Sequence, residues 1–134
     1  MTVDPMETVR ALYGAMRSRD LNELRRLGRQ NPRFEWTASA DEVDASARMP
    51  PAAALEYTRE LFEIFDKVQT EIVEEVEVND DRIILVVEHR VRGAASGIET
   101  SRREVHLWTF EHGEAISLRE FATLDEAQTA AGVR

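Results

Sequence analysis

The sequence contains no cysteine, which excludes a disulfide framework and thiol chemistry. It has no long apolar run either, since the longest, at residues 83–87 and 50–55, are far shorter than a membrane span, and the N-terminus lacks the apolar region of a signal peptide. Basic residues are few, with 17 Lys and Arg against 26 Asp and Glu, so the net charge of −9 repels nucleic acid and anionic membranes. We therefore expect a cytoplasmic protein with neither as a partner.

Sequence motifs for metals, phosphates and dinucleotides are also lacking. The three histidines are scattered, without the close mutual spacing of a ligand set. No phosphate-binding loop, nucleophile elbow or dinucleotide fingerprint occurs. We expect no metal site and no cofactor.

The composition is that of a folded soluble protein. Hydrophobic residues make up 43% and charged residues 32% of the 134 residues. This length suffices for one core and a cavity without disulfides. Because no repeat or linker divides the chain, residues 1–134 are predicted to form a single domain.

Helix signals dominate the first half of the chain. Asp4 and the proline after it predict one helix start, and Asp20 predicts the start of a shorter helix that ends at Gly28. Two prolines at 50 and 51 open a third helix, whose apolar face continues to about Val68. Residues 38–50 have no sustained period, and we interpret them as a surface loop and as a hypothetical lid over a ligand.

Strand signals dominate the second half. A short strand is predicted at 33–37, further strands at 70–78 and 82–92, the last of them long, and a hairpin at 101–123. A short C-terminal helix at 124–131 follows, with Gly132 at its end. Three helices followed by a meander of strands indicate an α+β fold.

The order of these elements and the segment LWTFEHGEAISLREF, residues 107–121, resemble the nuclear transport factor 2-like superfamily, in particular its SnoaL-like branch. The resemblance covers nearly the whole chain and is most specific at Arg119-Glu120-Phe121. It implies a cone-shaped, curved antiparallel sheet wrapped around three N-terminal helices, with an apolar cavity open at one end. It also implies a homodimer through the outer face of the sheet.

The hairpin allows two registers. With a three-residue loop and a bulge, one face carries Glu104, His106, Trp108, Ile116, Leu118 and Glu120. With a two-residue loop, His112-Gly113, the register slips by one, and the strand before the turn presents Val105, Leu107 and Thr109 instead. In the first register Trp108 lies opposite Ile116 and His106 lies opposite Leu118. We favour this register because it puts Trp108 on the same face as Leu118 and because the resemblance places Glu120 in the cavity.

The candidate catalytic residues are Glu120 and His106. SnoaL-like cyclases use a His and an Asp in the hairpin strands for proton abstraction. By this resemblance the position of the Asp matches Glu120, and His106 stands in for the His. A carboxylate among aromatic side chains loses solvation, so its pKa rises toward the range useful for a general acid or base. His106 is expected to orient it or to shuttle its proton. The candidate substrate-binding residues are Trp36, Tyr57, Phe62, Glu88, Arg90, Trp108 and Leu118. For Glu88 and Arg90 a structural ion pair is the alternative.

These residues predict a pocket protein for an apolar, oxygenated small molecule, with acid/base catalysis of the cyclase, isomerase or hydrolase type. The resembled superfamily also contains limonene epoxide hydrolases, whose first-strand Tyr and Asn are replaced here by Phe34 and Trp36. It contains ketosteroid isomerases too, whose acid at the end of the first strand has no counterpart in Trp36-Thr37. The alternative is a non-catalytic module that binds a hydrophobic ligand, or a dimeric interaction module. Whether the chain is an enzyme stays open at this stage.

Overall fold

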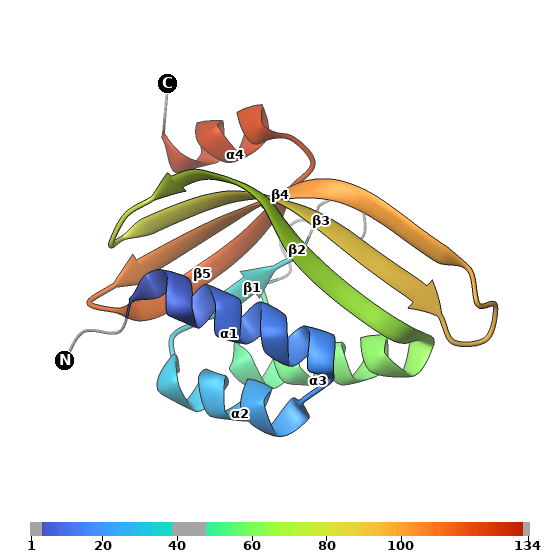
Figure 1. The fold of residues 1–134 in the computed structure, drawn as a ribbon. Helices are drawn as coiled ribbons and strands as arrows, with labels where there is room; N and C mark the ends of the chain where they lie inside the picture. Colours follow the sequence, from blue (N-terminus) through green and yellow to red (C-terminus); the bar gives the residue numbers. More distant parts are fainter. Residues whose placement is uncertain (1–3, 39–47, 133–134) are drawn as a thin grey trace.

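The structure, a computed structural model, describes residues 4–38 and 48–132. Three helices form a layer on one face of the sheet (Figure 1): α1 Pro5–Ser18, α2 Leu21–Gln30 and α3 Pro51–Ile64. The predicted caps of α1 and α2 are present, since Asp4 accepts a hydrogen bond from the Met6 amide at 3.1 Å and Asp20 accepts one from the Glu23 amide at 3.0 Å.

Two helix ends differ from the prediction. Gly28 lies inside α2, which continues to Gln30. The prediction for the end of α3 is also wrong, because the chain leaves the helix at Ile64 and Phe65 begins a strand. Apolar residues at 65 and 68 suit a helical face and a strand face alike, and Arg19 donates hydrogen bonds to the carbonyls of Phe62 and Phe65, where the helix ends.

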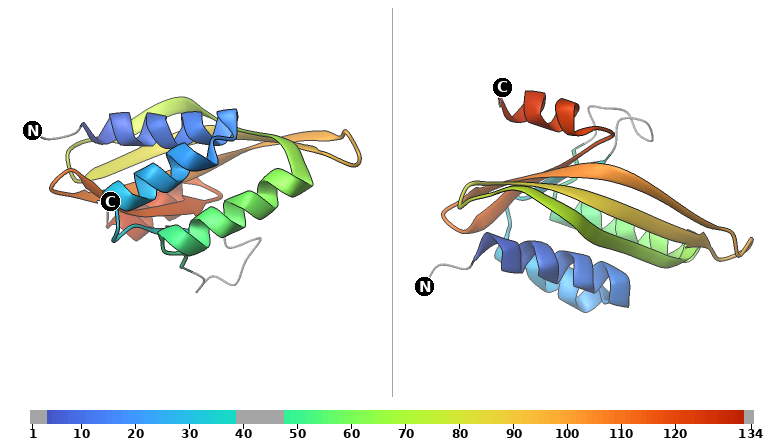
Figure 2. Two further views of the ribbon diagram at one scale, coloured as in Figure 1. Left: turned by 90° about the horizontal axis from the view of Figure 1, so that it is seen from below. Right: turned by 45° about the horizontal axis from the view of Figure 1, so that its top comes forward.

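The sheet contains five strands in the order β1-β5-β4-β3-β2: β1 Glu35–Thr37, β2 Phe65–Val78, β3 Arg82–Gly93, β4 Glu99–Glu111 and β5 Glu114–Phe121. Four of them form the predicted antiparallel meander, whereas β1 pairs in parallel with β5, so the sheet is mixed rather than antiparallel. The register of β2 against β3 shifts three times, and such bulges increase bending and twist. The sheet curves around the helical layer (Figure 2).

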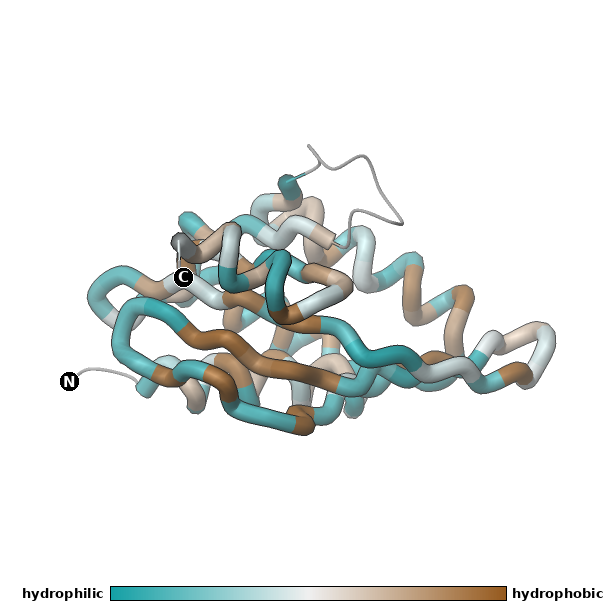
Figure 3. The backbone as a smooth tube through the Cα atoms, turned by 90° about the horizontal axis from the view of Figure 1, so that it is seen from above, coloured by the Kyte–Doolittle hydropathy of each residue, from teal (hydrophilic) through white to brown (hydrophobic). Residues whose placement is uncertain are grey.

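The opposite face of the sheet carries the short helix α4, Leu124–Ala131 (Figures 1 and 2). Thr123 caps it and Gly132, with φ of 79°, ends it as predicted. A small apolar cluster joins α4 to the sheet, with Ala127 on the helix and Ile84, Val105 and Leu107 on the strands. Figure 3, seen from this side, shows hydrophobic stretches along the strands and hydrophilic residues toward the turns. Because α4 covers part of this face, a homodimer through the sheet would have to use the remainder, and it stays a prediction.

The main core fills one end of the space between α1 and the sheet. It contains Met6, Val9, Tyr13, Ile83, Leu85, Val87, Trp108, Phe110, Ala115 and Leu118. Within residues 4–38 and 48–132, no helix is both long and apolar enough to cross a membrane. Most of the hypothetical lid, residues 39–47, lies outside the described residues, while Met49 pairs with Trp36 through two backbone hydrogen bonds.

Candidate functional site

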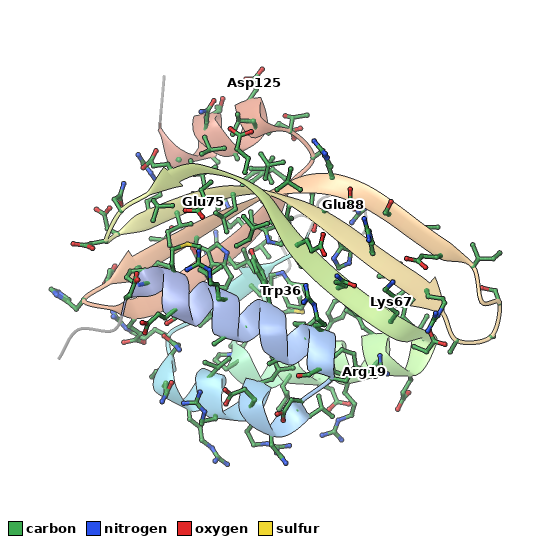
Figure 4. The ribbon with its side chains drawn as sticks, in the orientation of Figure 1. Arg19, Trp36, Lys67, Glu75, Glu88 and Asp125 are labelled. Carbon is green, nitrogen blue, oxygen red and sulfur yellow. The ribbon has the colours of Figure 1, made fainter. Side chains whose placement is uncertain are left out.

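A cavity of about 590 Å³ lies between the helical layer and the inner face of the sheet. Its helical walls are mainly apolar, with Leu12, Met16, Leu24, Leu55 and Leu61 among the lining residues. Figure 4 shows Trp36 between the helices and the sheet. Concave, mostly apolar spaces with a few polar groups are typical of small-molecule sites.

The hairpin between β4 and β5 combines features of both predicted registers, so neither was correct in full. The loop has two residues, His112 and Gly113, with φ of 51° and 81°, as in a type I′ turn. A bulge then leaves Ile116 without a partner, because Phe110 pairs with Ala115 and Thr109 pairs with Ser117. The bulge restores the cavity face, so that His106 lies opposite Glu120 and Trp108 lies opposite Leu118.

Four residues of the cavity wall form one buried hydrogen-bond chain. The indole Nε1 of Trp108 donates to the hydroxyl oxygen of Tyr13 at 3.1 Å. That hydroxyl lies 2.7 Å from His106 Nδ1, and His106 Nε2 lies 2.9 Å from Glu104 Oε1. The chain joins helix α1 to strand β4 and fixes the imidazole at both of its nitrogens.

Glu120 is placed beside this chain, at the cavity surface. Its Oε2 accepts a hydrogen bond from Trp36 Nε1 at 2.8 Å and lies 3.9 Å from His106 Nε2. Only 11% of the Glu120 side chain is exposed. The predicted pair of Glu120 and His106 is thus brought together, although its catalytic role is not tested by this geometry.

Burial and charge act in opposite directions on Glu104. Burial raises the pKa of Glu104, but the hydrogen bond from His106 and the electrostatic attraction of His106, His89 and Arg102 outweigh this effect, so the pKa of Glu104 lies below its usual value. Arg102 approaches Glu104 Oε2 to 3.3 Å without hydrogen-bond geometry, and that buried oxygen has no hydrogen-bond partner among the described residues. Burial raises the pKa of Tyr13 above its usual value, so its hydroxyl stays protonated. Glu104 is accordingly a carboxylate and Tyr13 a neutral phenol.

A polar row crosses the sheet next to Glu104. Thr70, His89 and Arg102 are consecutive partners on β2, β3 and β4, and all three line the cavity. Thr70 Oγ1 lies 3.2 Å from His89 Nδ1. The cavity is therefore polar along this row and apolar at the helices.

Three side chains lie close enough together to hold a metal ion, which the scattered histidines of the sequence did not predict. One donor atom each from Glu104, His106 and Glu120 lies within 4.8 Å of the others. Carboxylate oxygens and an imidazole nitrogen suit several divalent ions. Whether the imidazole can act as a ligand depends on which nitrogen carries its hydrogen.

Most of the predicted substrate-binding residues line the cavity: Trp36, Tyr57, Trp108 and Leu118. The rings of Trp36 and Tyr57 meet edge to face, with centroids 5.3 Å apart. Trp108 is stacked between Phe34 and Phe110.

Three predicted residues are not in the described cavity wall: Phe62, Glu88 and Arg90. Phe62 instead lies under the Arg19 guanidinium, 4.5 Å from its ring centroid. Glu88 and Arg90 form an ion pair with each other, because alternation along β3 turns His89 and Val91 inward and these two away. The alternative prediction for Glu88 and Arg90, a structural ion pair, agrees with this geometry.

Tyr13, Glu104, His89 and Arg102 were not among the predicted site residues. Alternation from His106 places Glu104 on its face of β4, and Arg102 is two residues further on. Tyr13 shares a helical face with Met6 and Val9, which indicates burial but not a hydrogen bond to a residue 93 positions away.

No family model matches the chain, and a search of curated proteins finds no match. Solved structures do resemble it. A protein of unknown function from Burkholderia pseudomallei, called NTF2-like, is 22% identical with a TM-score of 0.71, over 96% of this chain and 97% of that one. IdmH from Streptomyces antibioticus, a proposed polyketide cyclase, is 16% identical with a TM-score of 0.73, over 96% and 99%. A proposed SnoaL-like polyketide cyclase from Jannaschia is 21% identical with a TM-score of 0.69, over 94% and 90%. At these identities the likeness concerns the fold, and the chain has the nuclear transport factor 2-like fold.

Proposed function

We propose that the cavity binds an apolar, oxygen-bearing small molecule and that Glu120 acts as a general base on it, with His106 as its partner. The observation that carries the proposal is the position of Glu120, whose carboxylate is at the wall of an apolar cavity, is held by Trp36 and lies 3.9 Å from His106 Nε2. A carboxylate fixed in this way is suited to removing a proton from carbon next to a carbonyl group.

Such a proton transfer is the first step of cyclisation and of isomerisation. Glu120 takes the proton, and the carbonyl oxygen takes up the electron pair as an enolate. Return of the proton to another carbon isomerises the molecule. Attack of the enolate carbon on a second carbonyl instead closes a ring, and the oxygen of that carbonyl takes the electron pair and then the proton from Glu120. Two of the similar structures are proposed polyketide cyclases, which supports the second outcome.

The proposal is tested by hydrogen exchange on a ligand. Small apolar ketones are incubated with the protein in D₂O, and loss of the proton signal next to the carbonyl is followed by NMR. We expect the protein to accelerate exchange and Glu120→Gln to reduce this acceleration by about 100-fold or more, the usual contribution of a general base.

The matched control is Glu88→Gln, which removes a carboxylate from a strand of the same sheet but outside the cavity wall. Glu88→Gln should accelerate hydrogen exchange on the ketones as much as the unmodified protein does. Equal rates in Glu120→Gln and the unmodified protein would contradict the role of Glu120.

A second function, ligand binding without chemistry, is favoured by the predominantly apolar lining of the helical walls. It predicts saturable binding of the same ketones with no acceleration of exchange. In that case Glu120→Gln changes affinity only modestly.

A further inference from the structure

The hydrogen-bond chain through His106 has a direction, because its first member can only donate. An indole Nε1 carries a hydrogen and has no lone pair to accept another. Trp108 therefore donates to Tyr13, and the phenol oxygen is the acceptor. Among the described residues the Tyr13 hydroxyl has only one other partner, His106 Nδ1 at 2.7 Å.

The hydroxyl hydrogen of Tyr13 is satisfied only if it points to His106. Because the group is buried, leaving that hydrogen without an acceptor would cost about 1–3 kcal/mol. Nδ1 is then the acceptor and carries no hydrogen. The remaining hydrogen of a neutral imidazole is on Nε2, where it donates to Glu104 Oε1 at 2.9 Å.

We propose that Trp108 and Tyr13 act as positioning residues that hold His106 as a neutral imidazole with its hydrogen on Nε2. The assignment stands on the geometry alone, and only its catalytic meaning rests on the proposed function. In that function His106 presents an N–H, not a lone pair, to the carboxylates of Glu104 and Glu120. Glu120 is then the base, and His106 is the donor that stabilises and orients the negative charge beside it.

The direction of these hydrogen bonds also decides whether His106 can bind a metal ion at the candidate site. A ligating nitrogen needs a free lone pair, and Nε2, the atom that faces both carboxylates, carries the hydrogen. A cation could take this nitrogen only if the hydrogen moved to Nδ1. Tyr13 would then receive two donors and lose its own acceptor, so the chain disfavours a metal ion at this position.

Titratable and charged groups from several elements surround His106. Glu104 is on its own strand, Glu120 is on β5, Tyr13 is on α1, and Arg102 reaches it through Glu104. On β3, His89 acts on Glu104 through its charge. The two carboxylates lie on the Nε2 side of the imidazole, and the donor chain from Trp108 and Tyr13 lies on its Nδ1 side.

The test is the ring-nitrogen NMR spectrum of the 15N-labelled protein. His89→Gln and His112→Gln variants identify the His106 signals by removing the other two histidines. At neutral pH we expect Nε2 of His106 to show the signal of a nitrogen that carries a hydrogen and Nδ1 that of a bare, hydrogen-bonded nitrogen. The reverse pattern, or an imidazolium ion, would overturn the proposal.

Variants test the two positioning residues separately. In Trp108→Phe the Tyr13 hydroxyl is free to turn and accept, so we expect part of the His106 population to carry its hydrogen on Nδ1 and to show that pattern at neutral pH. Trp36→Phe removes the other cavity indole, which donates to Glu120, and should keep the unmodified pattern. An identical His106 spectrum in Trp108→Phe and the unmodified protein at neutral pH would contradict the role of Trp108.

Trp108 is a core residue, so its replacement could prevent the protein from folding. A second variant therefore tests the hydrogen-bond chain without changing Trp108. Tyr13→Phe removes the donor to Nδ1, and the Nδ1 signal should move to that of a nitrogen without a hydrogen bond while Nε2 is unchanged. An Nδ1 signal that does not move would overturn the assignment. Glu120 is not a member of the hydrogen-bond chain, so the two proposals can fail separately. If the unmodified protein shows the expected His106 spectrum but does not accelerate hydrogen exchange on the ketones, the proposed function is refuted and the positioning of His106 is not.

Discussion

Two carboxylates lie beside one imidazole in the cavity, and their surroundings assign them different tasks. Glu104 is buried, and His106 holds it as an ion. Glu120 lies at the cavity wall, and an indole hydrogen bond fixes one of its oxygens. Neighbouring carboxyl groups in unlike environments are a common way for a site to divide acid/base roles. Under the proposed function, Glu104 orients the imidazole and Glu120 contacts the ligand.

The lowered pKa of Glu104 predicts how the protein responds to acid. A carboxyl whose pKa is lower in the folded state stabilises the fold above its unfolded pKa of about 4.3, and this contribution is lost as the pH falls through the folded pKa. Glu104→Gln should therefore lower the free energy of unfolding by about 1 kcal/mol or more at neutral pH and by less below pH of about 4. Urea unfolding at both pH values measures the difference. Exposed Glu63→Gln is the control, and a Glu104→Gln effect that does not depend on pH would contradict the prediction.

The raised pKa of Tyr13 predicts the response to alkali. Its stabilising contribution is complete below the unfolded tyrosine pKa of about 10 and is lost as the pH rises through the higher folded pKa. We expect Tyr13 to ionise only when the protein unfolds. Ultraviolet absorbance of phenolate, followed together with circular dichroism, should show this ionisation coincide with unfolding, and Tyr13→Phe should lack it. Phenolate formation by Tyr13 in the folded protein would refute the prediction.

At the level of elements, the hairpin determines which residues face the cavity. Its Gly-containing turn was identified from the sequence, and so was the face with His106, Trp108 and Glu120. The register was not, because a two-residue turn and a compensating bulge together give the same face as a longer loop. Local patterns of alternation do not reveal which residue a bulge leaves unpaired, and here it is Ile116. The end of α3 was misplaced for a similar reason, since apolar residues at 65 and 68 fit both periods.

Two glycines should respond to alanine with opposite signs. Gly113 has φ of 81° in the turn, a left-handed conformation that costs a residue with a Cβ about 1–2 kcal/mol. Gly14 lies in α1, and apart from its chain neighbours and the helix's own backbone no atom lies within 4 Å of an added Cβ, so alanine there gains about 1 kcal/mol of helix propensity. Thermal unfolding should thus show a lower melting temperature for Gly113→Ala and a higher one for Gly14→Ala. A stabilised Gly113→Ala would indicate a different turn.

For the molecule as a whole, the order of its elements was the most informative property of the sequence. Helix caps at Asp4 and Asp20 and the meander of strands were sufficient to predict the layers and, through resemblance, the cavity. Long-range contacts were not predictable from the spacing of residues in the sequence. Tyr13 contacts His106 across 93 positions, and β1 pairs in parallel with β5 through Trp36 and Leu118. The net charge of −9 is likewise no guide to the cavity, where Arg102 and His89 lie beside Glu104.

The cavity itself predicts a fluorescence response, because both tryptophans of the chain line it. A naphthoquinone, which is apolar, bears oxygen and quenches indole emission, should quench Trp36 and Trp108 in a saturable manner. Ala54→Phe places a ring in the cavity wall and should weaken binding several-fold, whereas Ala53→Phe adds the same ring at an exposed, non-lining position of α3 and should not. Circular dichroism of both variants establishes that α3 is intact. Linear quenching without saturation, or equal affinities in the two variants, would mean that the quinone does not enter the cavity. The ligand proposal would then fail at its first step, because Glu120 can act only on a molecule that reaches Trp36.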